Sequence, residues 1–182
     1  MSIPKSAVEA VIREAVDEQV LKPENIPVID LYMDQVLSLF ESVTGGGSAG
    51  MTKAMINNYS KDKLLTPVKG KKYTREQLVR MLLIYYMKPV LQIQSIKTVL
   101  SALEGTDDMM KLYSGFLEER AGQAEKIPSA AGELMPEGEE LTDEEAAMLI
   151  MALCSLAGQL KQAAERLVED CLSNRESEGK KK

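Results

Sequence analysis

The sequence predicts a mainly α-helical protein with a small winged helix-turn-helix head, additional helices and a long C-terminal helix. Three observations predict this fold class. Apolar residues recur at three- and four-residue spacings in several segments, which is the period of an amphipathic helix. A lysine-glycine-lysine turn between two short extended segments is typical of a tight hairpin. Finally, residues 141–173 carry one sustained apolar repeat.

The N-terminal segment predicts one helix and a connector. Residues 4–21 place their valine, isoleucine and alanine side chains at helical spacing. Lys22 precedes a proline and ends the helix, because a residue in that position is pushed out of the helical region. Pro27 closes the connector, so we assign residues 1–27 to this part of the chain.

Two short helices joined by a glycine-rich turn follow. The first is predicted from Leu31 to Phe40, with Asp30 as its N-cap. Residues 44–50 contain too much glycine to hold regular structure. The second helix covers residues 52–61. It should turn three apolar or aromatic residues inward, Met55, Ile56 and Tyr59, and four hydrogen-bond donors outward, Lys53, Asn57, Asn58 and Lys61.

A short β-hairpin is predicted next. Residues 64–68 and 72–73 read as extended segments, and they flank Lys69-Gly70-Lys71. Glycine near the tip suits a tight turn, because it adopts positive φ without steric cost. A hairpin that follows a short polar-faced helix is typical of a wing.

Three more helices complete the head. Thr74 and Gln77 have the spacing of a capping box and predict a helix that ends or kinks at Pro89. The apolar pattern predicts another helix over residues 90–103 and a third over residues 107–121. We therefore assign residues 28–121 to a winged helix-turn-helix domain with supporting helices.

The C-terminal region predicts a linker, one long helix and a tail. Residues 122–140 are rich in Gly, Pro, Ala and Glu, as in a solvated linker. Thr142 and Glu145 form a second capping box that opens a helix over residues 141–173. Its seam could pair between chains or dock within one. The seam residues are Ala146, Ile150, Leu153, Ala157, Leu160, Ala164, Leu167 and Cys171. Residues 174–182 predict a disordered tail.

Charge is distributed unevenly along the chain. Residues 52–97 carry ten basic and two acidic side chains, a net charge of +8, whereas the whole chain carries −6 and the remainder therefore −14. A local excess of this kind points to a surface for a polyanion. The basic residues are Lys53, Lys61, Lys63, Lys69, Lys71, Lys72, Arg75, Arg80, Lys88 and Lys97.

Composition argues against most catalytic chemistry. Histidine is absent, so the commonest general base and metal ligand is missing. Cys154 and Cys171 lie on one predicted helix, about 25 Å apart, too far for a disulfide within the chain. No stretch approaches the roughly 20 apolar residues of a membrane span. We expect a cytoplasmic, non-enzymatic protein with no cofactor, no metal, no membrane association and no obvious small-molecule ligand.

Three weaker motifs have ordinary structural explanations. Residues 45–52 approach a phosphate-binding loop, but the lysine position holds Met51. The acidic run Asp143–Glu145 is explained by capping of the last helix. Cys171 could act as a redox sensor in a parallel dimer, although its acidic neighbours Glu169 and Asp170 do not favour a reactive thiolate.

Several motifs resemble the winged DNA-binding domain of MerR-type regulators: Met55-Ile-Asn-Asn-Tyr59, Lys63-Leu-Leu65, Pro67, Lys71-Lys-Tyr-Thr-Arg-Glu-Gln-Leu78 and Ile96-Lys-Thr-Val-Leu100. More closely, two segments are similar to a bacterial family known as domain of unknown function 1836, itself regarded as MerR-like: Asp30-Leu-Tyr-Met-Asp-Gln35 and Met51-Thr-Lys-Ala-Met-Ile-Asn-Asn-Tyr59. The resemblance implies a regulator but names no target.

The chain departs from the MerR pattern at three positions. Asn57 and Lys71 stand where that family has arginines, and Lys63 stands where it has glycine. Lysine keeps the charge of arginine but loses its bidentate fork, so phosphate contact survives these changes better than base contact.

We expect a sequence-specific regulator that binds double-stranded DNA, with pairing into a homodimer through the last helix as one of the two roles left open for its seam. The expected DNA-binding residues are Lys53, Asn57, Asn58, Lys61, Lys69, Lys71, Lys72, Arg75 and Arg80, the two arginines as phosphate clamps. The expected dimerisation residues are Ile150, Leu153, Ala157, Leu160, Ala164 and Leu167. Two alternatives remain: an adaptor whose basic head docks an acidic partner, and an acidic module that closes over the head.

Overall fold

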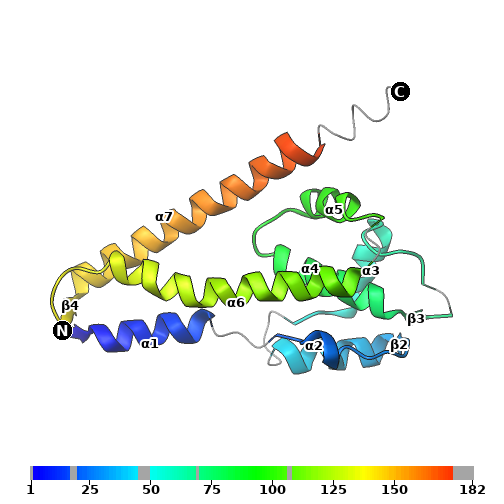
Figure 1. Ribbon diagram of the computed structural model, residues 1–182, viewed down its shortest axis with the longest axis horizontal. Helices are drawn as coiled ribbons and strands as arrows, with labels where there is room; N and C mark the ends of the chain where they lie inside the picture. Colours follow the sequence, from blue (N-terminus) through cyan, green and yellow to red (C-terminus); the bar gives the residue numbers. More distant parts are fainter. Residues whose placement is uncertain (1, 17–19, 45–49, 69, 106–107, 174–182) are drawn as a thin grey trace. The chain divides into compact units, whose positions relative to one another are not determined.

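The computed structural model describes residues 2–16, 20–44, 50–68, 70–105 and 108–173. Over these ranges the protein is mainly α-helical with short antiparallel strand pairs (Figure 1), which confirms the mainly α-helical part of the predicted fold class. The chain forms two compact units, each drawn from two separate stretches. Unit 1 comprises Met1–Glu18 and Phe116–Gln162, and unit 2 comprises Gln19–Gly115 and Ala163–Lys182.

Unit 1 is built around a strand pair that the sequence did not predict. Ile3 lies opposite Leu141 in this pair, and the Lys5 N–H donates to the Glu139 carbonyl at 2.8 Å. The pair therefore sets the start of α1 beside the start of α7. The elements of unit 1 are β1 (Ser2–Pro4), α1 (Lys5–Val16), most of α6 (Met109–Glu133), β4 (Glu140–Thr142) and the first part of α7 (Asp143–Leu167).

The prediction of a linker over residues 122–140 is wrong for most of that stretch. Helix α6 begins after Asp108, whose carboxylate accepts from the N–H groups of Met110 and Lys111 at 3.0 Å, and it continues to Glu133. Pro128 removes one backbone donor inside the helix. The alanine and glutamate residues around it are strong helix formers, and Ala131 is buried, so the helix continues through the proline.

Helix α7 begins as predicted. The Glu145 N–H donates to Thr142 Oγ1 at 3.2 Å, and the Thr142 N–H donates to the Glu145 carboxylate at 2.8 Å, which completes the capping box. The backbone hydrogen bond from Thr142 lowers the pKa of Glu145, and the Thr142 hydroxyl and Lys5 add to this effect. By length and composition alone, the helical stretch Asp143–Ser173 is the one in the described residues that could cross a membrane, which is weak evidence by itself.

Unit 2 is organised around α4, because five of its residues are at most 1% exposed: Leu78, Val79, Met81, Leu82 and Ile84. The other elements are η1 (Pro23–Asn25), β2 (Leu31–Tyr32), α2 (Met33–Thr44), α3 (Lys53–Lys61), β3 (Lys72–Tyr73), α4 (Arg75–Met87), α5 (Ile93–Ala102), the start of α6 and η2 (Val168–Ser173). The capping box predicted for α4 is present, and the helix ends before Pro89 as expected.

Two distant segments are attached to the core of unit 2. The Tyr113 hydroxyl donates to the Leu21 carbonyl at 2.8 Å, and both residues are buried. At the other end of the chain, η2 packs against α5 and buries Val168. The connector after α1 and the C-terminal end of the long helix therefore belong to the same core.

The predicted start of the second helix is wrong by two residues. Leu31 and Tyr32 form β2 and pair with Tyr73 and Lys72, and α2 begins only at Met33. Asp30 is therefore not the N-cap; instead the Gln35 side chain accepts from the Tyr32 N–H at 2.9 Å. Buried Leu31 beside exposed Tyr32 fits the two-residue period of a strand, which the apolar helical pattern concealed.

Candidate nucleic-acid interface

Helix α3 separates its buried and polar residues as the sequence predicts. Thr52 caps the helix by accepting from the Met55 N–H at 3.2 Å. Ile56 is fully buried and Tyr59 is 2% exposed, and burial raises the pKa of the Tyr59 hydroxyl. The four predicted outward residues are all exposed: Lys53, Asn57, Asn58 and Lys61.

The C-terminal end of α3 presents one further lysine. The Leu64 N–H donates to the Tyr59 carbonyl at 2.9 Å and the Lys63 N–H to the Ser60 carbonyl at 3.2 Å, which is a Schellman motif. Lys63 occupies its left-handed position with φ of 60°, where glycine is favoured. Its side chain is exposed directly after the helix. Lys63 was not among the expected DNA-binding residues, although the sequence placed it in the basic segment of residues 52–97 and at the glycine position of the MerR pattern.

Replacing Lys63 with glycine should stabilise the protein. The left-handed conformation costs a lysine about 1–2 kcal/mol, and the greater chain entropy of unfolded glycine offsets part of the relief. We expect the free energy of unfolding in urea to rise by about 0.5–1 kcal/mol. Lys61→Gly, within α3, should lower it instead. Equal losses for both variants would show that Lys63 is not strained.

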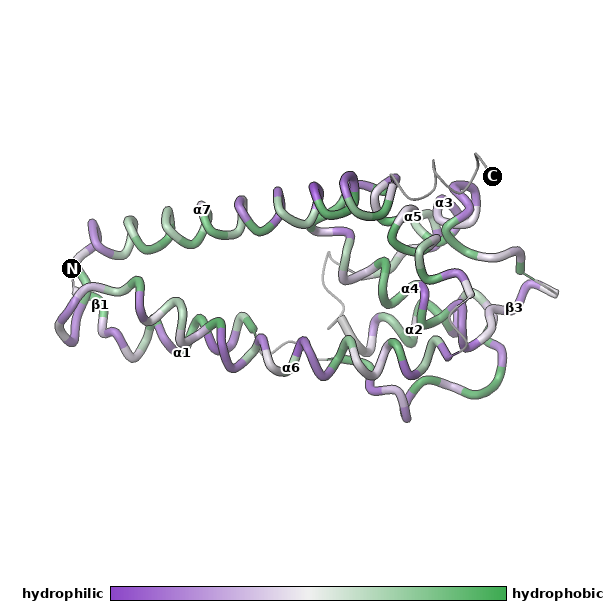
Figure 2. The backbone as a smooth tube through the Cα atoms, turned by 45° about the horizontal axis from the view of Figure 1, so that its top comes forward, coloured by the Kyte–Doolittle hydropathy of each residue, from purple (hydrophilic) through white to green (hydrophobic). Residues whose placement is uncertain are grey.

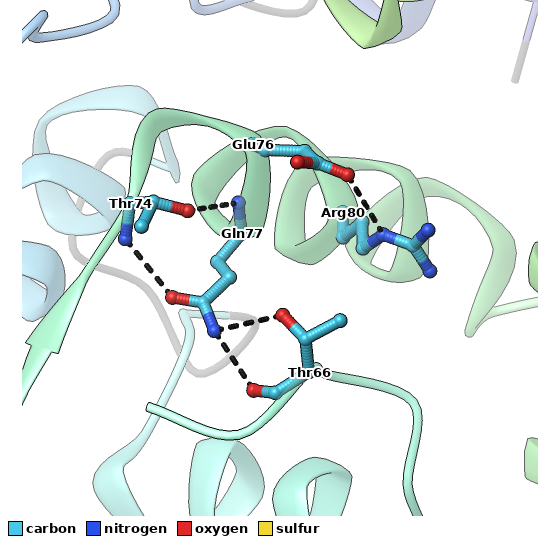
Figure 3. A network of polar contacts seen from close by, with 5 residues as sticks. All are labelled: Thr66, Thr74, Glu76, Gln77 and Arg80. Carbon is cyan, nitrogen blue, oxygen red and sulfur yellow. Dashed lines mark hydrogen bonds and ion pairs between the residues drawn. The ribbon is translucent and has the colours of Figure 1, made fainter. Parts of the chain in front are cut away.

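The predicted hairpin is wrong, because β3 pairs with β2 and not with residues 64–68. The Gln77 amide Nε2 donates to the Thr66 carbonyl at 2.8 Å and to the Thr66 hydroxyl at 3.0 Å (Figure 3), which ties this segment to the first turn of α4. Gly70 and Lys71 then turn the chain with φ of 61° and 63°. We call residues 62–68, 70 and 71 the basic loop.

The remaining predicted contacts divide into exposed and internal groups. Lys71 is exposed in the basic loop, and Lys72 is half-buried with its Nζ 4.9 Å from the centroid of the Tyr32 ring. Lys69 lies outside the described residues. Lys88, at the end of α4, was not among the expected DNA-binding residues. Its Nζ lies 5.6 Å from the centroid of the Tyr59 ring, so this lysine is beside α3.

The two predicted phosphate clamps make contacts within the chain. Arg75 is half-buried and donates through Nη2 to the Pro23 carbonyl at 2.9 Å. Arg80 is 8% exposed, and its Nε lies 3.8 Å from the Glu76 carboxylate (Figure 3). The structure therefore does not group these arginines with the exposed lysines.

The described residues bear on three other kinds of site, namely metal, thiol and phosphate-binding sites. They hold no group of three His, Cys, Asp or Glu side chains that could bind a metal. Cys154 and Cys171 are free thiols. Residues 45–49 of the approximate phosphate loop, which include three of its four glycines, lie outside the described ranges. In the α7 seam, Ala157 is exposed, Leu153 and Ala164 are half-buried, and three residues are at least 60% exposed, Ile150, Leu160 and Leu167.

Comparison with known proteins gives one result. A protein-family model described as Domain of unknown function (DUF1836) matches residues 21–116. No curated protein and no solved structure matches the chain. The matched stretch runs from the connector after α1 into the first turns of α6, and it contains α3 and the basic loop.

Proposed function

The chain belongs to the family described as Domain of unknown function (DUF1836), and we propose that the matched region is a MerR-like helix-turn-helix head that binds double-stranded DNA and has the basic loop in place of a hairpin wing. The protein is then a sequence-specific transcriptional regulator. One observation carries the proposal: α3 is anchored by Ile56 and Tyr59 and leaves only lysine, asparagine and small residues exposed. A helix with this surface fits the major groove of B-DNA.

The exposed side of α3 supplies the groups that read base edges. Asparagine side chains pair with the N6 and N7 edge of adenine, so Asn57 and Asn58 are the candidates for base recognition. Lys53 and Lys61 stand at the two ends of the helix, where an ammonium group can reach guanine or phosphate oxygens.

The basic loop supplies the phosphate contacts in place of a hairpin wing. Lys63 and Lys71 are exposed at positions fixed by a Schellman motif and a turn. Lysine binds phosphate as a point charge, so these residues orient the head without selecting sequence. Arg75 and Lys72 hold the connector and the β2–β3 pair that support the loop.

Reversing two exposed charges tests the proposal. Lys53→Glu combined with Lys71→Glu should weaken binding to duplex DNA about 10- to 100-fold, and the slope of log affinity against log salt should flatten by about 0.9 for each lost phosphate contact. Fluorescence anisotropy with a randomised duplex at several salt concentrations measures both quantities. Urea unfolding of the variant verifies that the head is folded.

The matched control is Lys111→Glu combined with Lys126→Glu. Both are exposed lysines of α6 and lie outside the basic stretch of residues 52–97. This control changes the net charge of the protein by the same amount as the test variant, but it should retain most of the affinity for duplex DNA. Equal losses in both double variants would indicate a non-specific charge effect. No salt-dependent binding of the unaltered protein to duplex DNA at low salt would exclude the proposal and favour an acidic protein partner.

A further inference from the structure

Helix α7 has an exposed apolar side within unit 1. Six residues recur along it at three- and four-residue spacing, and all are exposed: Ala147, Ile150, Met151, Cys154, Ala157 and Gly158. Ile150 is 61% exposed and Met151 is 57% exposed. Figure 2 shows hydrophobic residues repeated along this part of the helix. A contiguous apolar surface of this kind marks a binding surface in a soluble protein.

An apolar groove between α1 and α7 continues this surface. It has a volume of about 340 Å³, and Ile150 lines both the groove and the exposed side of α7. None of the lining side chains is polar, whereas small-molecule sites combine apolar walls with a few polar groups that orient the ligand. The lining residues are Ile3, Ala7, Val8, Val11, Ile12, Ala146, Leu149, Ile150 and Leu153. Purely apolar walls suit the core of a homodimer interface instead.

The charges at the ends of this surface indicate its occupant. Asp143, Glu144 and Glu145 form the first turn of α7, and Lys161 lies on the same side as Ile150 after the apolar stretch. In an antiparallel pair of α7 helices, the acidic first turn of each copy meets Lys161 of the other, and the two-fold axis passes near Ala152 and Leu153. A parallel pair would set acid against acid and lysine against lysine.

We propose that unit 1 binds a second copy of this chain, with the two α7 helices antiparallel across a two-fold axis and α1 flanking them on each side. The partner's apolar side chains enter the groove of each copy. Such an isologous interface uses the same residues twice, as closed dimers do. The proposed interface does not depend on DNA binding. It differs from the heptad seam expected from the sequence, because it includes α1 as well as α7.

Sedimentation equilibrium of the full chain tests the interface. Met151→Glu puts a charge into the apolar contact and should raise the dimer dissociation constant at least about tenfold. Gln159→Glu adds the same charge on the opposite side of α7 and should leave the constant unchanged. Circular dichroism and urea unfolding verify that both variants fold. A chain that is monomeric at every concentration, or a dimer insensitive to Met151→Glu, overturns the proposal.

A charge exchange tests the direction of the helices. Glu144→Lys and Lys161→Glu should each weaken the dimer, and the double variant should recover most of the affinity, because the acidic first turn and Lys161 face each other only in the antiparallel pair. No recovery in the double variant overturns the antiparallel arrangement.

Cross-linking locates the contact. A Cys171→Ser variant, which retains Cys154 near the proposed axis, should be joined into dimers by a short bis-maleimide, and a Cys154→Ser variant should not. The reverse result places the contact elsewhere. Partition of the chain onto phosphatidylcholine vesicles, abolished by Met151→Glu, would identify a membrane as the occupant and exclude the second copy.

Discussion

Replacing Tyr113 with alanine is expected to lower the free energy of unfolding by about 3–5 kcal/mol, the range found when a buried aromatic ring is removed. The Tyr113 side chain is fully buried, and its hydroxyl donates to the Leu21 carbonyl at 2.8 Å. The substitution leaves a cavity and an unsatisfied carbonyl, and it releases the connector from the start of α6. Urea unfolding followed by circular dichroism measures the loss.

A conservative series separates the two effects. Tyr113→Phe keeps the ring and removes only the hydroxyl, so its cost should be about 1–2 kcal/mol. Tyr32→Phe, at a 48% exposed position whose ring faces Lys72, should change stability little. If Tyr113→Ala cost no more than Tyr113→Phe, the ring would have no packing role and the described core of unit 2 would be wrong.

Local rules predicted most of the helices. The capping boxes at Thr74 and Thr142 involve partners three residues apart, so the sequence contains both donors and acceptors. The apolar period of α3 likewise predicted which side of that helix would be exposed. In each case the deciding interactions lie within one or two helical turns.

Interactions between distant segments could not be predicted in this way. The β1–β4 and β2–β3 pairs join short segments that lie far apart in the sequence and are too brief to show an alternating pattern. The hairpin prediction paired β3 with the extended segment nearest to it in the sequence, residues 64–68. Its actual partner is β2, which precedes α2. For the same reason the chain does not reveal that Arg75 bonds to the Pro23 carbonyl or that Lys88 lies over Tyr59.

Substituting leucine for Gln77 should have the second largest effect, because this side chain connects two segments of the head. Gln77 is 3% exposed; its Oε1 accepts from the Thr74 N–H at 2.9 Å, and its Nε2 donates to the Thr66 carbonyl and hydroxyl (Figure 3). Leucine makes none of these bonds, so the free energy of unfolding should fall by about 2–3 kcal/mol. Gln94→Leu, at an exposed position on α5, should change little.

The Gln77→Glu variant identifies which bond matters. An ionised carboxylate still accepts from the Thr74 N–H but cannot donate to the Thr66 carbonyl, and burial raises its pKa above that in the unfolded chain. Its destabilisation should therefore be smallest below the unfolded pKa of about 4.3 and should grow as the pH rises through the folded value. If the destabilisation were independent of pH, the Thr66 bonds would not contribute.

The Gln77→Leu variant also tests the proposed function, because the hydrogen bonds from Gln77 to Thr66 hold the basic loop between Lys63 and Lys71. If that loop contacts phosphate, Gln77→Leu should weaken DNA binding under conditions where the protein is still folded, and the loss should exceed the fraction unfolded. If affinity follows only the folded fraction, Gln77 stabilises the head but does not position the loop. Stability and affinity measured on the same samples, with Gln94→Leu as the reference, distinguish these cases.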